Sequence, residues 1–231
     1  MTRLARVVIP GLPHHVTQRG NRRAPIFFEP GDQAVYRDLL AREAARRDIE
    51  VWAYCLMPNH VHLILTPARE EGLSLAVGET HRRYTNFINA RSRWTGHLFQ
   101  SRFSSVVMDE AHLITAARFV SLNPVRARLA TRAEDWPWSS ARAHLAGADD
   151  GLVKVAPLLE RIDDIALFLS DTTADEIAFT ALRAAELTGR PAGDANFIAA
   201  LERRLGRALA PRRRGRKARE KDEAEKQVLL V

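Results

Sequence analysis

Two histidines stand one residue apart in the segment MPNHVHLIL, residues 57–65. Residues at i and i+2 of a β-strand point to the same face, so the rings of His60 and His62 can reach one point in space. The apolar residues that alternate with them would face the opposite side. Two neutral imidazoles and an oxygen ligand would hold a divalent cation with positions left open for phosphate oxygens. Alternating histidines can also be simple polar side chains, so the pair alone leaves both interpretations open.

A tyrosine is the candidate nucleophile for a phosphate held in this way. Of the three tyrosines in the chain, Tyr36 falls on an amphipathic helix and Tyr54 within a hydrophobic strand, where packing is the ordinary role of the ring. Tyr84 lies in a basic stretch, because residues 81–108 include five arginines and no acid. Positive charge draws a phosphate backbone to the phenol and stabilises a developing phenolate. An exposed aromatic ring that stacks on bases explains the same stretch.

Strands and helices must position these residues. Hydrophobic periodicity and turn residues predict the order strand, helix, strand, strand, helix, strand, followed by more helix. This is the split βαβ, ferredoxin-like arrangement of the α+β class, in which an antiparallel sheet carries its helices on one face and leaves the other available for a site. The strands are expected at 14–21, 49–57, the histidine segment and 104–108. The helices are expected at 32–47, 73–93 and 109–122, with Asp32 and Asp109 as caps and Asn123-Pro124 as the final stop.

The chain is predicted to consist of a main domain and an extension. Residues 1–133 form the expected catalytic domain, 134–154 a linker, and 155–210 a C-terminal helical domain of three short helices, broken at Ser170 and at Gly189-Arg190-Pro191. The amphipathic segment GDANFIAALERRLGR fits either DNA contact or a stabilising bundle. Residues 211–231 carry six cations between Arg212 and Arg219, which predicts a basic, disordered tail.

The charge balance favours a polyanionic partner. The 231 residues carry a net charge of +7, mostly as arginine, whose planar fork matches phosphate and stacks on bases. An ordinary enzyme with an arginine-rich surface is the alternative. Cys55 is the only cysteine, so we expect no disulfide framework, no thiolate metal site and a reducing compartment. Since no apolar run approaches the roughly 20 residues of a membrane span, we expect a cytoplasmic, nucleoid-associated protein with no membrane partner.

Four motifs, in order, resemble the HUH single-tyrosine transposases, and most closely the REP-associated tyrosine transposases of bacteria, which have an IS200-like transposase domain. They are HHVTQRGNRR, MPNHVHLIL, YTNFIN with the following GHLFQSRFSS, and VSLNPVRARL. The resemblance continues in WPWSS and in LTGRPAGDANFIAALERRLGR, so it covers most of the chain.

This resemblance implies an enzyme that nicks and joins DNA. His60 and His62 would be the HUH motif and would ligate Mg²⁺ or Mn²⁺. Tyr84 would attack a phosphodiester of single-stranded DNA and give a 5′-phosphotyrosine intermediate with a free 3′-hydroxyl. In the wider superfamily, a polar side chain about one helical turn after the tyrosine completes the site. Position i+4 here is Ile88, which cannot coordinate, so Asn89 is the expected third ligand; the alternatives are Asn86, Gln18 and His15.

The resemblance also implies folded single-stranded DNA, such as an imperfect palindromic hairpin, as substrate. A monomer is favoured, and a homodimer is the alternative. Two other functions stay open: an HUH replication initiator or relaxase, and a non-catalytic regulator that binds DNA hairpins. The residues expected to contact DNA are basic or aromatic: Arg19, Arg22, Arg23, Arg82, Arg83, Arg91, Arg93, Trp94, Arg102 and Arg126.

Overall fold

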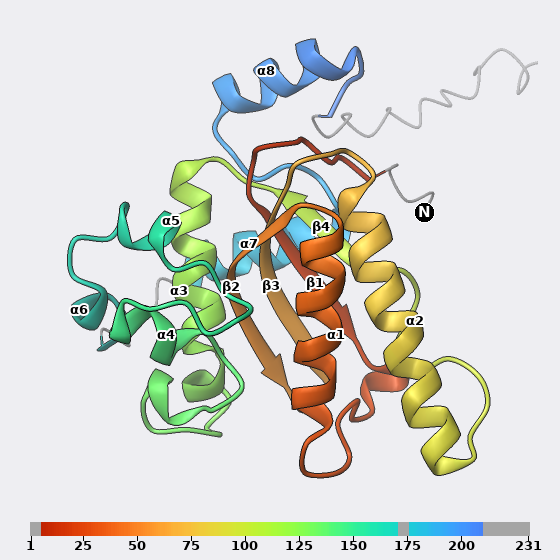
Figure 1. The fold of residues 1–231 in the computed structure, drawn as a ribbon. Helices are drawn as coiled ribbons and strands as arrows, with labels where there is room; N and C mark the ends of the chain where they lie inside the picture. The colour runs from red at the N-terminus through yellow and green to blue at the C-terminus, as the bar shows by residue number, and fades with distance from the viewer. Residues whose placement is uncertain (1–5, 171–175, 210–231) are drawn as a thin grey trace, which may run out of the picture.

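A four-stranded antiparallel sheet forms the centre of the molecule (Figure 1). The computed structural model describes residues 6–170 and 176–209, so the predicted basic tail lies outside the described residues. The strands are β1 (His14–Arg19), β2 (Ile49–Met57), β3 (His60–Pro67) and β4 (Ser104–Val107). Their order in the sheet, β2-β3-β1-β4, is the ferredoxin-like order and confirms the predicted fold class.

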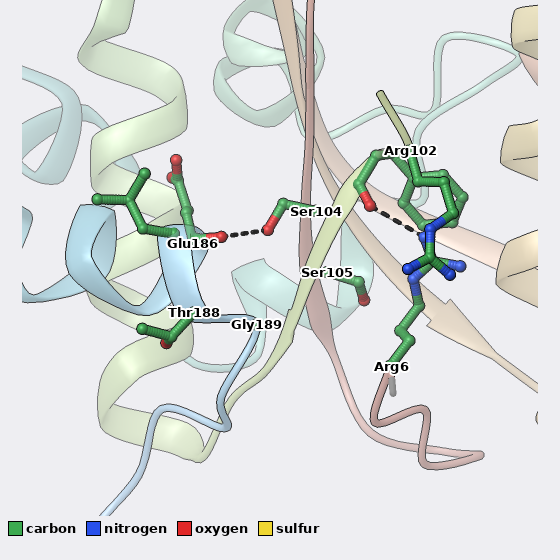
Figure 2. Close-up of a pocket in the computed structure, with 9 residues that line it drawn as sticks. Arg6, Arg102, Ser104, Ser105, Glu186, Thr188 and Gly189 are labelled. Atoms are coloured by element: carbon green, nitrogen blue, oxygen red, sulfur yellow. Dashed lines mark hydrogen bonds between the residues drawn. The ribbon is translucent and has the colours of Figure 1, made fainter. Parts of the chain in front are cut away.

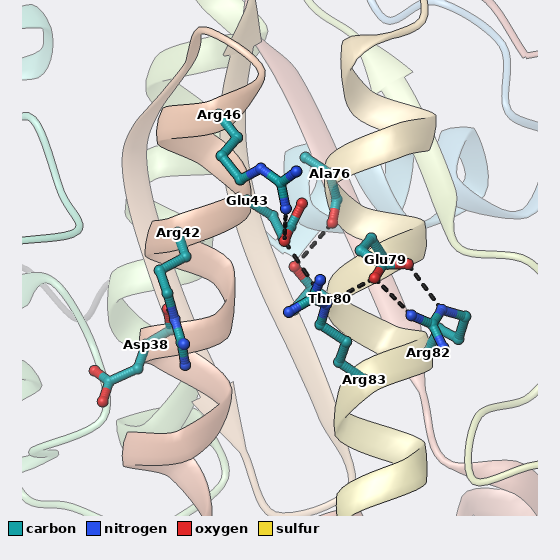
Figure 3. Close-up of polar contacts among 9 residues, drawn as sticks. All are labelled: Asp38, Arg42, Glu43, Arg46, Ala76, Glu79, Thr80, Arg82 and Arg83. Atoms are coloured by element: carbon teal, nitrogen blue, oxygen red, sulfur yellow. Dashed lines mark hydrogen bonds and ion pairs between the residues drawn. The ribbon is translucent and has the colours of Figure 1, made fainter.

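Two helices, α1 (Asp32–Arg46) and α2 (Gly72–Ser92), cover one face of the sheet (Figure 1). They bury the apolar side of β3, including Val61 and Leu63. Inward-facing residues of α2 recur at spacings of three and four, which is why its buried stripe includes Tyr84. An ion pair joins the two helices: the buried Glu43 of α1 lies 3.8 Å from Arg83 of α2 and also contacts Arg46 of its own helix (Figure 3).

The other face of the sheet is covered by helices of the C-terminal half. There α3 (Glu110–Arg126) and α7 (Glu176–Thr188) pack on β2, β3 and β4. Ile64 and Val106 belong to the same buried cluster as Phe119 of α3 and Phe179 of α7. The sequence predicts that this face is available for a site, whereas the need to bury these apolar side chains leaves only part of it open.

The helix ends differ in two places from the predicted caps and stops. Asp109 caps α3 as predicted, since its carboxylate accepts a hydrogen bond from the His112 N–H at 2.9 Å. The predicted stop at Asn123-Pro124 is wrong, because α3 continues to Arg126 with Pro124 inside the helix, although the proline removes one i→i−4 hydrogen bond. Asp32 does not cap α1 either: it is the first helical residue and follows the N-cap Gly31.

Asp32 instead ties three segments together. Its buried carboxylate accepts hydrogen bonds from the backbone N–H groups of Phe28 and Glu29, at 2.8 and 3.0 Å. It also accepts two hydrogen bonds from the Arg91 guanidinium, at 2.6 and 2.9 Å. The start of α1 is thereby joined both to the preceding loop and to the end of α2.

The predicted linker packs against the sheet rather than standing apart. Three backbone hydrogen bonds attach the predicted linker 134–154 to β2: Leu56 N–H to Trp138 O, Ser140 N–H to Tyr54 O, and Lys154 N–H to Val51 O. The predicted domain boundaries stay predictions. The short helices are η1 (Asn21–Arg23), η2 (Ala133–Asp135), α4 (Ala141–Ala146), α5 (Ala156–Leu159), α6 (Ile165–Ser170) and α8 (Ala195–Leu205). Among the described residues, no helix is long and apolar enough to span a membrane.

Candidate metal centre and DNA cleft

His60 and His62 lie on the sheet face that α3 and α7 cover. In the strand register, His62 is opposite Thr17 of β1 and Cys55 of β2, and His60 is opposite Arg19. The two imidazole ring centroids are 4.9 Å apart, with an interplanar angle of 84°. The spacing of one residue therefore places both rings on one side of β3, as a ligand pair requires.

Two further groups join His62 from other elements. The Nε2 atom of His15, on β1, is 3.0 Å from the Nδ1 atom of His62. The other ring nitrogen of His15 is 3.3 Å from a carboxylate oxygen of Glu186, on α7. His15, His62 and Glu186 each offer one ligand atom within 4.8 Å of the others. His15 was predicted from the sequence only as an alternative third ligand, and Glu186 was not predicted.

The donor set fits a divalent cation. Burial lowers the pKa of His60 to about 4 and that of His15 to about 3, and it also holds the pKa of His62 well below its usual value. The imidazoles are therefore neutral at pH 7, with lone pairs available. Burial raises the pKa of Glu186 to about 7. Nδ1 of His15 and Oε1 of Glu186 are buried without a hydrogen-bond partner, and a cation between them would satisfy both.

A cleft with a volume of ≈ 210 Å³ opens beside this group and is lined by His60, His62, Glu186, Arg19 and Arg102. Arg19 and Arg102 are exposed, so their guanidinium groups can meet an anion in the cleft. The cleft shares its β4 wall with the smaller pocket in Figure 2, where the Ser104 hydroxyl donates a hydrogen bond to the backbone carbonyl of Glu186 at 2.6 Å. This bond fixes α7 against β4 next to the histidines.

The structure does not bring Tyr84 to the histidines. Its side chain is fully buried on the opposite face of the sheet, in the cluster formed with α1. The hydroxyl donates a hydrogen bond to the Ile26 carbonyl at 2.7 Å. The ring packs against those of Tyr36 and Phe27, with centroid-to-centroid distances of 5.3 and 5.7 Å. Burial also raises the pKa of the phenol, which disfavours the phenolate. In this arrangement Tyr84 is a core residue.

The expected third ligand, Asn89, also lies away from the histidines. Asn89 lies on α2, and its side-chain amide donates a hydrogen bond to the Gly96 carbonyl at 3.0 Å. Asn86 is exposed on the same helix. Gln18 is on β1, but its amide donates to the carbonyls of Gln100 and Ser101. Of the alternatives named from the sequence, His15 is the one that lies against His62.

The predicted DNA-contacting residues fall into two groups. Several are held by other side chains: Arg82 and Arg83 by Glu79 (Figure 3), Arg91 by Asp32, and Arg126 by Glu176. The remaining residues are Arg19, Arg22, Arg23, Arg93, Trp94 and Arg102, which are exposed, as Arg82 and Arg83 are too. Arg19, Arg22 and Arg23 follow one another at the end of β1 that carries the cleft.

An aromatic residue of α3 faces the imidazoles. The ring of Phe119 has its centroid 5.2 Å from that of His62 and 6.1 Å from that of His15, with edge-to-face geometry in both pairs. Phe179 of α7 packs on its other side at 5.2 Å. Phe119 is buried and was not singled out from the sequence, because a phenylalanine within an amphipathic helix ordinarily signals packing alone.

Replacing Tyr84 by phenylalanine is expected to leave the metal centre and the cleft unchanged. The variant should lose about 1 kcal/mol of unfolding free energy, because the buried Ile26 carbonyl would lose its donor. Urea unfolding measures this loss, and Mn²⁺ titration measures the metal centre. Tyr36→Phe is the matched control, since that hydroxyl pairs with His81 in the same cluster. Loss of Mn²⁺ binding in folded Tyr84→Phe protein would contradict this account.

Comparison with known proteins gives one family and one fold. The family model described as transposase IS200 like matches residues 9–123. A solved REP-associated tyrosine transposase bound to a REP hairpin is similar with a TM-score of 0.56 and 20% identity, over 75% of this chain and 96% of that chain. A putative transposase from Deinococcus radiodurans R1 is 20% identical over 55% of this chain and 92% of that chain, with a TM-score of 0.36. No curated protein matches.

Proposed function

Because the chain belongs, through residues 9–123, to the IS200-like transposase family, we propose that it binds single-stranded hairpin DNA in the cleft beside His60 and His62. The observation that carries this proposal is the meeting of neutral imidazoles and exposed arginines in that cleft. The similar transposase of known structure is bound to a REP hairpin, which supports a hairpin as the ligand class.

A divalent cation, Mg²⁺ or Mn²⁺, is the proposed cofactor of this site. His62 belongs to both candidate ligand groups: the pair with His60 along β3, and the cluster with His15 and Glu186. When bound, such a cation would neutralise charge on a DNA phosphate. The protein's part is to hold neutral nitrogen donors at fixed positions on a rigid sheet, with Glu186 supplied by α7.

The arginines position the DNA backbone in this proposal. Arg19 and Arg102 border the cleft, and a guanidinium can donate two hydrogen bonds to one phosphate. Arg22 and Arg23 extend the positive surface along the same end of β1. Contacts of this kind supply affinity and register on the nucleic acid, while the hairpin supplies the shape that is recognised.

Strand cleavage through Tyr84 has no support in this arrangement. Its hydroxyl would have to leave the Ile26 carbonyl and pass from one face of the sheet to the other. The function that the geometry supports best is therefore metal-assisted hairpin binding by a member of a transposase family.

Removing both cleft arginines is expected to weaken hairpin binding. The double variant Arg19→Ala, Arg102→Ala should bind about 10-fold more weakly at moderate salt, because two phosphate contacts are lost. The slope of log affinity against log salt should fall by roughly 1.4 for a single-stranded ligand. Fluorescence anisotropy with a labelled single-stranded hairpin, over a range of salt concentrations, measures both quantities.

Arg69→Ala is the matched control for charge. Arg69 is 70% exposed but follows the far end of β3, so its loss should leave affinity nearly unchanged. An unstructured strand of equal length tests the ligand class. If it binds as tightly as the hairpin, or if the wild-type protein binds neither, the proposed function is wrong.

A further inference from the structure

All three tyrosines of this chain point away from the histidine face. Their rings lie in the cluster that α1 and α2 form on the other side of the sheet. Their hydroxyls pair there as well: Tyr36 with His81 at 2.9 Å, Tyr54 with Asp150 at 2.5 Å, and Tyr84 with Ile26 at 2.7 Å. Within the described structure, which includes every tyrosine of the sequence, a DNA phosphate beside His62 would meet no phenol.

The aromatic residue that lies against both His62 and His15 is Phe119, which is buried behind the cleft. Its ring lies edge-to-face against both His62 and His15. The guanidinium carbons of Arg126 and Arg183 lie over the same ring, 5.5 and 5.4 Å from its centroid. An oxygen on this ring would thus have imidazoles and guanidinium groups around it, which is the environment that stabilises a phenolate. Phenylalanine has no such oxygen.

We infer that this chain binds hairpin DNA without becoming covalently joined to it, and that Phe119 is the position that decides this. The inference rests on the proposed function, because it assumes that the DNA phosphate lies beside His62. It predicts a gain of activity rather than a loss: a single added oxygen, in Phe119→Tyr, supplies the missing nucleophile.

The step expected of the variant is an ordinary transesterification. The introduced phenolic oxygen forms a bond to phosphorus, and the bond between phosphorus and the 3′-oxygen breaks. The phenolic proton passes to water or to a neutral imidazole, and the departing 3′-oxygen takes up a proton to become a hydroxyl. The protein then carries the 3′ part of the strand through a 5′-phosphotyrosine, so a label at the 3′ end of the hairpin follows the adduct.

The test uses the full-length protein, Mn²⁺ and a single-stranded hairpin labelled at its 3′ end. A native gel reports binding, and a denaturing gel followed by protease digestion and mass spectrometry reports covalent linkage and its position. Wild-type protein and Phe119→Leu are expected to give a retarded complex and no adduct. Phe119→Tyr is expected to give an adduct at position 119, at least 100-fold above the wild-type background.

Each result bears on a different claim. An adduct in wild-type protein, above all one that Tyr84→Phe removes, would overturn the inference. So would the lack of an adduct in Phe119→Tyr protein that is folded and retards the hairpin. The lack of a retarded complex with wild-type protein would instead refute the proposed function. If Phe119→Tyr does not fold, adding Phe179→Leu makes room for the hydroxyl, since Phe179 packs against the ring, and the same criteria apply.

Discussion

Mn²⁺ binding is expected to fall by at least about 100-fold when His62 is replaced by alanine. His62 lies 3.0 Å from His15 and beside His60, so its loss breaks both candidate ligand groups at once. A group that only hydrogen-bonds to a metal ligand is typically worth roughly 10- to 100-fold in metal affinity, and a direct ligand should be worth more. Isothermal titration of the full chain with Mn²⁺ at pH 7 measures the change.

His97→Ala serves as the control for this experiment. His97 is exposed in the loop after α2 and does not line the cleft. Its variant should bind Mn²⁺ like the wild-type protein. Wild-type affinity in folded His62→Ala protein would show that the imidazole group is not the metal centre, whatever the DNA measurements give.

The largest expected loss of stability comes from Asp32→Ala. The change removes the acceptor of two backbone N–H groups and leaves Arg91 without its bidentate partner. We expect the free energy of unfolding to fall by about 2 to 3 kcal/mol, below the value for a fully buried pair because 26% of the Arg91 side chain is exposed. Denaturant unfolding at pH 7 measures this, with the exposed Asp38 of the same helix as control. A loss below 0.5 kcal/mol, the usual range for surface changes, would contradict this role.

The same carboxylate predicts a pH dependence. Burial opposes its charge, but Arg91 and the two backbone donors outweigh burial, and the folded-state pKa of Asp32 lies below its ordinary value. Its contribution to stability is therefore fully present above the ordinary pKa and is lost as the pH falls through the lower folded value. The stability difference between wild type and Asp32→Ala should shrink as acid is added, and a difference that stays constant would argue against the ion pair.

Local patterns in the sequence predict most of the fold. The i, i+2 spacing places His60 and His62 on one face of a strand, Asp109 caps its helix, and the order of elements predicts the sheet. These features depend on neighbours in the chain. Where α3 ends was harder to predict, because the packing of its apolar face extends it through Pro124.

The position of Tyr84 could have been predicted from the sequence. Both crossover helices of a ferredoxin-like unit pack on one face of the sheet, and that face must be the apolar one. On β3 it is the side of Val61 and Leu63, opposite His60 and His62. A tyrosine on the inner side of α2 therefore belongs with Val61. The arginines around Tyr84 indicated a position beside a DNA phosphate instead, and this packing constraint was therefore missed.

Glu186 could not have been found in this way. It reaches His15 only because α7 folds back onto the sheet from far along the chain, and no spacing rule links a short helix to a distant strand. The position of Phe119 could be predicted only in part. Its helix was predicted, but the contact of its ring with the histidines follows from packing among α3, α7 and the sheet.

The late position of Glu186 in the chain has a consequence for biosynthesis. As the protein leaves the ribosome, β1 and β3 emerge well before α7. The carboxylate is thus the last of the three donors to arrive, and the group of His15, His62 and Glu186 closes only when the C-terminal third has docked. A nascent or prematurely terminated chain carries the imidazoles of His15 and His62 without the carboxylate of Glu186.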